Sequence, residues 1–392
     1  MTEQAMETAL PDFTLRPVPQ VHFGAGRARR IAEDAAALAL PGKAAALIVD
    51  GTLQELGLAA GVIGGLEATG LEVAVFAEIS GEPEQAQVEA ATEFLRGRDA
   101  GLVVCLGGGS ALDIGKIAAC VAPTGRGPAD FAMKAESLPG PGLPKICLPT
   151  TAGTGSELSS TNIFHGENGK KVWIWSTRSK PDAVILDPEL TTSLPPRLTA
   201  WTGLDAFVHA LESCSNVWRQ PANDLYAHRA LALIAGALER AVAEPENLQA
   251  RGRMLLGSAY AGIAIDNCNV AMAHNISHAL AALAPVHHGL ATALGLAAVL
   301  PWQAEADQGP FAAAAQACGL AADARALSDW YADLLDRCGV ERRLPEAFKA
   351  FGAADLAREM RAPETAFSRE SSARKVEDDD IDRFAAAVMA MA

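Results

Sequence analysis

The chain has 392 residues, of which 50% are hydrophobic and 20% are charged. This length exceeds that of a usual single domain, so two domains are expected. The 32 basic and 47 acidic side chains give a formal net charge of −15 at pH 7, which disfavours nucleic acid and anionic membrane as partners. Seven scattered cysteines without a C-x-x-C pair indicate reduced thiols and a cytoplasmic location. The N-terminus lacks the apolar run of a secretory signal, and no apolar stretch is long enough to span a bilayer.

Short apolar runs alternate with helical stretches from about Val21 to Pro196. A helix is predicted over Pro83–Gly97, and strands are predicted over Ala44–Val49, Leu71–Phe76, Leu102–Leu106, Lys145–Leu148 and Ala183–Leu186. This alternation is typical of a mostly parallel sheet covered by helices, an α/β arrangement.

After Pro195-Pro196 the strand signal disappears, and apolar residues recur at helical spacing to Ala392. Helix breaks are expected near Pro221, Pro245, Pro285, Pro301 and Pro345, and a helix start is expected at the acidic cluster from Glu377. We therefore predict an α/β domain over residues 1–196 and an all-helical domain over residues 197–392.

Three glycines directly follow the strand predicted over Leu102–Leu106, in Gly107-Gly108-Gly109-Ser110, and a helix then begins. Without Cβ atoms the backbone can approach a ligand, and the exposed N–H groups of the helix favour an anion such as phosphate. A tight structural turn is the alternative interpretation.

Two further segments follow predicted strands. The loop Pro149–Ser156 is rich in hydroxyls and glycine, which suits hydrogen bonds to a ribose or a carboxamide but is equally typical of a structural turn. Asp50 follows the strand Ala44–Val49. An acid at such a strand end can accept the ribose hydroxyls of a dinucleotide and repel a 2′-phosphate, although many such residues serve only the turn.

Histidines form the clearest functional signal. Asp205 and His209 are spaced i, i+4, so they share one face of a helix that is otherwise apolar. His274 and His278 repeat this spacing, and His287-His288 follows at an expected helix start. Carboxylate and imidazole together suit a divalent ion such as Fe²⁺ or Zn²⁺. The spacing leaves open which two of the last four histidines are ligands.

The motifs Gly107–Lys116, Pro149–Glu157, Asp187–Thr191, Gly203–Glu212 and His274–Gly289 occur in the order found in iron-containing (group III) alcohol dehydrogenases, which this chain resembles. The resemblance implies a Rossmann-like dinucleotide-binding domain, a helical domain, and an active site in the cleft between them. It implies that Asp205, His209, His274 and His288 bind the metal and that His278 is a further catalytic histidine. The residues expected to contact NAD(P) are Asp50, Gly108, Gly109, Ser110, Asp113, Thr150, Thr151, Ser160 and Lys171.

Three positions depart from the family pattern. His278-Ala279-Leu280-Ala281 replaces a common His-Pro-Leu-Gly, His287 precedes the last ligand, and Glu82-Pro83-Glu84 stands where many members have Asn-Pro. None of these changes removes a ligand. The first and third are expected to alter the substrate pocket and the cofactor contacts.

The resemblance implies reversible hydride transfer between a primary alcohol, or its aldehyde, and a nicotinamide, with the metal as a Lewis acid. We expect NAD rather than NADP as the cofactor, and Fe²⁺ in preference to Zn²⁺ as the metal. We also expect a homodimer or higher homo-oligomer. The first alternative is a dehydroquinate-synthase-like lyase, which depends on metal and NAD, but such enzymes typically bind their ion through Glu and two His. The second is a metal- or nucleotide-sensing module without turnover.

Overall fold

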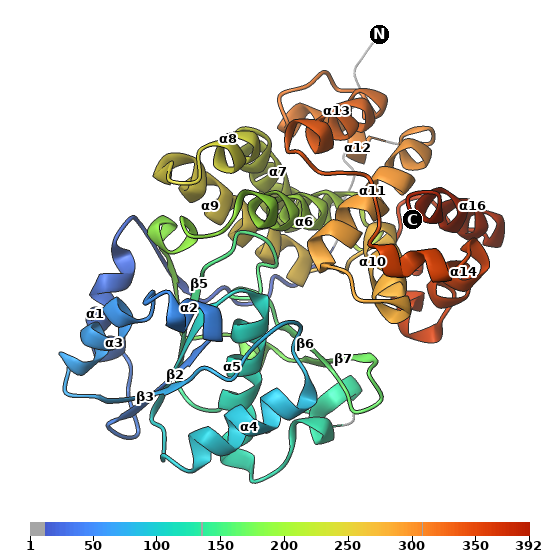
Figure 1. Cartoon of the computed structure of the whole chain (residues 1–392). Coiled ribbons are helices and arrows are strands. Elements are labelled where there is room, and N and C mark those ends of the chain that lie inside the picture. The colour runs from blue at the N-terminus through green and yellow to red at the C-terminus, as the bar shows by residue number, and fades with distance from the viewer. Residues whose placement is uncertain (1–11, 135, 308) are drawn as a thin grey trace.

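The computed structural model describes residues 12–134, 136–307 and 309–392. Within these ranges, a part that contains all the strands extends to Leu186 and is followed by a part made of helices. Figure 1 shows the first part in blue to green and the second in green-yellow to red, on top of it in this view.

The main sheet contains six strands in the spatial order β1 (Gln20–Phe23), β8 (Ala183–Leu186), β5 (Lys145–Pro149), β4 (Leu102–Gly107), β2 (Ala44–Val49) and β3 (Glu72–Phe76). All neighbouring strands in it run parallel. The predicted parallel α/β sheet is confirmed, and the five predicted strands are found to within one residue at each end.

Helices cover both faces of this sheet. They are α1 (Ile31–Ala37), α2 (Gly51–Glu55), α3 (Ala60–Glu67), α4 (Gln85–Arg96) and α5 (Gly109–Val121). Because side chains alternate along a strand, Ile48 and Cys105 pack towards α4 and α5, whereas Leu47 and Val104 pack towards α1 and α3. This alternation explains why the central strands are apolar throughout.

Three strands were not predicted. One is the edge strand β1, and the other two are β6 (Thr161–His165) and β7 (Lys171–Trp175), which form an antiparallel hairpin. The hairpin contacts the helical part, because Lys170 Nζ lies 2.6 Å from Glu364 Oε1 and the Trp173 and Phe367 rings meet edge to face at 5.7 Å.

The second part consists of α6 (Pro196–Ser215), α7 (Pro221–Ala235), α8 (Leu238–Ala243), α9 (Leu248–Asp266), α10 (Met272–Leu283), α11 (His288–Ala304), α12 (Pro310–Ala317), α13 (Ala324–Arg337), α14 (Ala353–Met360), α15 (Ala366–Glu370) and α16 (Asp378–Met389). The 3₁₀ helices of the chain are η1 (Arg27–Arg30), η2 (Ala122–Thr124), η3 (Pro128–Lys134), η4 (Thr177–Ser179), η5 (Pro188–Thr191), η6 (Glu346–Ala350) and η7 (Pro363–Thr365). No strand follows Leu186 in the described residues, which confirms the predicted helical second half.

One predicted break is wrong. Helix α11 does not end at Pro301 but continues through it to Ala304. Proline removes one N–H from the helical ladder, yet the next residue, Trp302, is fully buried and Glu305 N still bonds to Pro301 O at 3.3 Å. Packing of this last turn outweighs the lost hydrogen bond.

The two parts share a packed boundary. Val184 and Leu186 of β8 belong to the same buried apolar cluster as the helices α6 and α9. A division into separate domains at residues 196/197 therefore stays a prediction. None of the helices in the described ranges has both the length and the apolar character that crossing a bilayer requires.

Candidate active site and metal cluster

The three segments predicted to bind a dinucleotide follow three neighbouring strands. Val49 of β2 pairs with Leu106 of β4, and Gly107 of β4 pairs with Pro149 of β5. Asp50, Gly108 and Thr150 therefore lie side by side at the carboxyl ends of parallel strands. In open α/β sheets this edge is where ligands bind.

The turn after β4 is built for close approach. Gly107 has a φ of 154°, a conformation that only glycine adopts without strain, and Gly108 forms the N-cap of α5. A Cβ on Gly109 would lie 2.9 Å from Thr154 Cγ2 in the loop after β5. Helix α5 thus begins at a turn that has no side chains of its own and lies against Thr151 and Thr154 of the loop after β5, and the N–H groups at a helix start favour an anion.

Asp50 and Ser110 both lie at this edge and also make local hydrogen bonds. Asp50 caps helix α2, where its Oδ1 accepts a hydrogen bond from Thr52 N at 2.8 Å, so its Oδ2 is left for other donors. Ser110 Oγ donates to Gly81 O at 2.9 Å. The loop after β5 is held to the glycine turn by Thr150 N, which donates to Gly107 O at 2.9 Å.

Asp113 and Ser160 lie deeper. The Asp113 carboxylate accepts hydrogen bonds from the Ser156 hydroxyl and from Ile163 N at 3.0 Å, and burial raises the pKa of Asp113 above its ordinary value. Ser160 is fully buried, and its N and Oγ bond to Asp266 at 2.6 and 3.2 Å. Their polar groups already serve the protein interior, so their predicted cofactor contact stays a prediction.

The loop after β5 also contacts the helix that carries the first metal candidates. A Cβ on Gly153 would lie 2.8 Å from Thr202 Cβ on α6. Thr202 precedes Asp205 by three residues, nearly one helical turn. A Cβ on Gly155, whose φ is +62°, would lie 2.6 Å from Gly262 Cα on α9. The loop therefore joins the proposed cofactor edge to the histidine cluster.

The four residues predicted as metal ligands come together. Asp205 and His209 lie on α6, His274 lies on α10, and His288 is the first residue of α11. Each offers one donor atom, and these four atoms lie within 4.8 Å of one another. His274 Nε2 is 3.0 Å from His209 Nε2, and Asp205 Oδ1 is 3.8 Å from His274 Nε2 and 3.6 Å from His288 Nε2.

These residues fit a divalent cation. Asp205 is 2% exposed, and its Oδ1 finds no hydrogen-bond partner among the described residues. A buried carboxylate oxygen without a partner is costly, and a cation among the converging nitrogens would satisfy it. One carboxylate and three imidazoles without sulfur suit Fe²⁺ or Zn²⁺.

Two groups of residues that the sequence did not reveal hold the imidazoles from behind. Glu212 Oε2 lies 2.7 Å from His274 Nδ1. Ser277 Oγ lies 3.1 Å from His288 Nδ1 and accepts a hydrogen bond from Thr292 Oγ1 at 3.1 Å. Only the spacing of Glu212, seven residues after Asp205 on the same helical face, could have suggested its role.

Burial and the neighbouring carboxylates act in opposite directions on the pKa values of His209 and His274. Burial lowers the pKa of His209 and holds the pKa of His288 well below the ordinary value. It also acts to lower the pKa of His274, but the charge and hydrogen bond of Glu212 and the charge of Asp205 outweigh it, so that this pKa is raised. Neutral imidazoles are the form that binds a metal.

His278 lies beside the cluster without joining it. Its ring centroid is 6.2 Å from that of His274 and 6.0 Å from that of His288, and it is not among the four converging residues. Burial, followed by the charge of Lys171, holds the pKa of His278 well below its ordinary value. Lys171 itself pairs with Glu82, Nζ to Oε2, at 3.3 Å.

The unusual His287 has a different role from His288. It forms the N-cap of α11, where its Nδ1 accepts a hydrogen bond from Gly289 N at 3.2 Å. Its ring packs on Trp201 with centroids 4.9 Å apart. This cap starts helix α11 so that His288 occupies its first turn, beside Asp205.

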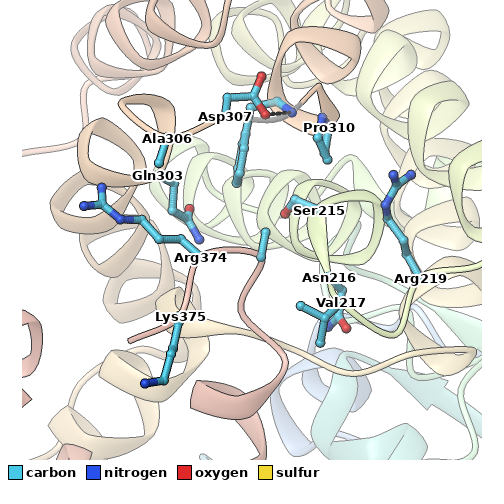
Figure 2. A pocket seen from close by; sticks show the side chains of 12 residues that line it. Ser215, Asn216, Val217, Arg219, Gln303, Ala306, Asp307, Pro310, Arg374 and Lys375 are labelled. Carbon is cyan, nitrogen blue, oxygen red and sulfur yellow. Dashed lines mark hydrogen bonds between the residues drawn. The ribbon is translucent and has the colours of Figure 1, made fainter. Parts of the chain in front are cut away.

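A separate cavity of about 350 Å³ lies where α6 and α11 end, and Figure 2 shows the residues lining it, among them Ser215, Gln303 and Arg374. None of the residues predicted from the sequence as site residues lines it. Ser215 lies ten residues beyond Asp205 on α6, about 15 Å along the helix axis. The cavity is therefore distinct from the metal cluster.

Comparisons with known proteins agree with this geometry. Residues 18–188 match the family model described as iron-containing alcohol dehydrogenase, and residues 199–351 match that of the C-terminal part of the Fe-containing alcohol dehydrogenase family. A sulfoacetaldehyde reductase from Bilophila wadsworthia is 37% identical over 253 residues, which are 64% of this chain and 65% of that protein, slightly less than two thirds of its length.

Two further relatives match more of the chain. A 1,3-propanediol dehydrogenase from Klebsiella pneumoniae is 34% identical over 305 residues, 77% of this chain and 78% of that protein. The crystal structure of a sulfoacetaldehyde reductase from Bifidobacterium kashiwanohense in complex with NAD⁺ is similar with a TM-score of 0.85 and 33% identity. That similarity covers 95% of this chain and 97% of the other.

Proposed function

Because the chain belongs to the iron-containing alcohol dehydrogenase family, we propose that it transfers a hydride reversibly between a primary alcohol, or its aldehyde, and NAD. The observation that carries this proposal is the convergence of Asp205, His209, His274 and His288 beside the loop at the cofactor edge, which packs against α6, the helix that carries Asp205 and His209. The metal cluster and the cofactor edge are therefore neighbours. Hydride transfer between a substrate at the metal and a nicotinamide at this edge requires such proximity.

The chain's own residues would supply binding and orientation. When bound by Asp205 and the three histidines, an ion such as Fe²⁺ supplies Lewis-acid polarisation of the substrate oxygen. The N–H groups at the start of α5 would hold the pyrophosphate, and the loop with Thr150 and Thr151 would orient the nicotinamide. His278, beside the cluster, would carry the released proton towards solvent on a ring nitrogen.

NAD is the proposed cofactor rather than NADP. Asp50 lies at the end of β2, next to the glycine turn, where a carboxylate can accept the ribose hydroxyls. The same carboxylate would repel a 2′-phosphate. The similar reductase from Bifidobacterium kashiwanohense was crystallised with NAD⁺, which supports this choice.

The lyase alternative is not favoured. Dehydroquinate-synthase-like enzymes typically hold their ion with Glu and two His, whereas the cluster here uses an aspartate and three histidines, and its glutamate, Glu212, lies behind His274. A sensing module would differ from the proposed dehydrogenase in activity, because it would bind metal and NAD but convert no alcohol.

Location and assembly are further parts of the proposal. All seven cysteines are free thiols, which supports the reducing cytoplasm. We propose a homodimer or higher homo-oligomer, by analogy with the family alone.

The test is a panel of primary alcohols and aldehydes on metal-reconstituted protein, followed by NADH absorbance. We expect turnover with some members, its loss on chelation with a near-native far-ultraviolet circular dichroism spectrum, and recovery on anaerobic addition of Fe²⁺. If the protein binds both metal and NAD but converts no member of the panel, the proposed enzymatic activity is wrong and the sensing module is favoured. Full activity in metal-free protein would refute the role of the metal.

A further inference from the structure

We propose that Glu212 is the positioning residue of the metal cluster, which fixes the ring of His274 so that Nε2 faces the ion. The inference rests on the proposed metal site and adds to it a residue outside the four ligands. It concerns the hydrogen bond to His274 Nδ1 and the N-terminus of α10, the helix that carries His274.

The carboxylate of Glu212 is buried, with 3% of the residue exposed, and it is fully engaged. Its Oε2 accepts a hydrogen bond from Ala271 N at 2.7 Å and lies 2.7 Å from His274 Nδ1. Its Oε1 accepts one from Ala273 N at 2.7 Å. All three partners lie at the start of α10, while Glu212 itself lies on α6.

This arrangement determines which nitrogen of His274 carries the proton. An ionised carboxylate only accepts hydrogen bonds, so His274 Nδ1 must donate. The lone pair is then on Nε2, which lies 3.0 Å from His209 Nε2 and 3.8 Å from Asp205 Oδ1. A carboxylate behind a histidine ligand sets its tautomer and ring orientation in this way and makes it a stronger ligand.

The same carboxylate also sets where α10 begins. Ala271 is the N-cap of α10 and provides no side-chain cap, so the first N–H groups of the helix are bound instead by Glu212 from the neighbouring helix. Negative charge at a helix N-terminus is favourable. One side chain therefore fixes both the position of α10 relative to α6 and the rotation of the His274 ring.

The other two imidazoles are held less firmly. His288 Nδ1 meets the neutral hydroxyl of Ser277 at 3.1 Å. His209 Nδ1 is buried and lies 3.9 Å from Asp205 Oδ2, beyond the distance of a charge-assisted hydrogen bond. Charge-assisted hydrogen bonds are roughly twice as strong as neutral ones, so among the three histidines His274 is the most strongly preorganised.

The test is the affinity for Zn²⁺ of the full-length protein, stripped of metal and titrated in competition with a chelator of known affinity. Glu212→Gln keeps the shape of the side chain but has a single acceptor oxygen. Its NH₂ group would meet either Ala273 N–H or, in the other orientation, both Ala271 N–H and His274 Nδ1, and in the second case the proton of His274 moves to Nε2. We expect affinity to fall by about 10- to 100-fold.

The matched control is Asp187→Asn. Asp187 is also buried, and its carboxylate accepts hydrogen bonds from Gly26, Ala28 and Glu189 N–H groups, but it touches none of the four ligands. We expect this variant to lower the melting temperature while Zn²⁺ affinity stays within about twofold of the unaltered protein, since the cluster keeps its carboxylate support.

The outcomes separate the two levels of the proposal. If the unaltered protein binds no Zn²⁺, the proposed metal site itself is wrong. If it binds Zn²⁺ and Glu212→Gln binds equally well, or weakens only as much as Asp187→Asn, the role of Glu212 is wrong and the metal site stands.

A second measurement does not depend on folding of the variant. In the unaltered protein, labelled with ¹⁵N-histidine and loaded with Zn²⁺, the His274 signals, assigned by comparison with His274→Asn, should show a proton on Nδ1 and none on Nε2. The opposite tautomer would overturn the inference.

Discussion

The contact between the loop after β5 and helix α6 can be tested by adding a single methyl group. In Gly153→Ala the new Cβ would lie 2.8 Å from Thr202 Cβ and 3.0 Å from Thr202 O. Carbon atoms in ordinary contact are about 3.5–4.0 Å apart, so loop and helix must separate by roughly 0.7 Å or more. No rotamer change relieves this, because two of the three atoms that the Cβ would meet, Thr202 O and Thr202 Cα, are backbone atoms.

Two effects of different size are expected from Gly153→Ala. Overpacking of this kind costs about 1–3 kcal/mol of unfolding free energy. A misplacement of about 1 Å between reacting groups can cost roughly 100-fold in rate, so kcat/KM for the best alcohol of the panel should fall by about that factor. Urea unfolding and NADH absorbance measure the two quantities.

Gly61→Ala is the matched control. Gly61 lies within α3, and a Cβ there would meet nothing within 4 Å, so alanine should stabilise the helix by roughly 0.5–1 kcal/mol and leave kcat/KM unchanged. If Gly153→Ala behaves like this control, with kcat/KM within about twofold of the unaltered protein, then the loop does not set the distance between cofactor and metal.

Three further changes address single groups. Asp50→Gly should reduce the preference for NAD over NADP by about tenfold in the ratio of kcat/KM values, because like charge at the 2′-phosphate is removed; an unchanged ratio would show that Asp50 points elsewhere. His278→Ala should keep stoichiometric metal, measured by atomic emission, while kcat falls about 100-fold; loss of the metal would instead make it a ligand. Burial raises the pKa of Glu157 from 4.5 to about 7, so its carboxyl keeps a proton in the folded but not in the unfolded protein between these values. The unfolding free energy should therefore fall by about 3 kcal/mol as pH rises through that window, and Glu157→Gln should flatten this dependence in urea unfolding.

The central sheet was predictable because each of its inner strands has an apolar run that can be seen in the sequence without knowing which strand it pairs with. Strands β2, β4 and β5 are buried on both faces, so they are apolar apart from Lys145 at the start of β5, and they lead into turns with aspartate, glycine or threonine. The hairpin β6–β7 was missed although it has a signal of its own. Strand β6 alternates in burial, and the two strands flank a turn at residues 166–169 with two glycines, a pattern typical of antiparallel pairs. The edge strand β1, which is mostly exposed, has too few apolar residues to be found.

In the metal cluster, local spacing and tertiary structure contribute separately. The i, i+4 rule placed Asp205 and His209 on one face before any fold was known. It could not decide which two of His274, His278, His287 and His288 are ligands, because that choice depends on how α10 and α11 are placed against α6. Glu212 shares the face of Asp205, but its partner His274 is 62 residues away. Hydrogen bonds over such separations depend on the fold and leave no periodic signal.

Directional contacts hold the junction of the two parts in addition to the apolar packing of Val184 and Leu186. Asp266 at the end of α9 forms a buried ion pair with Lys180, Oδ2 to Nζ, at 2.8 Å and also binds Ser160 of the α/β part. Gly155 packs backbone to backbone on Gly262. Buried ion pairs contribute little net stability because desolvation offsets their attraction, but they are strongly destabilising when one partner is displaced. Such contacts permit only a narrow range of positions for the cofactor edge relative to the metal-binding helices. Hydride transfer needs reacting atoms about 3–3.5 Å apart, so a junction that tolerates little displacement is what the proposed chemistry requires of this fold.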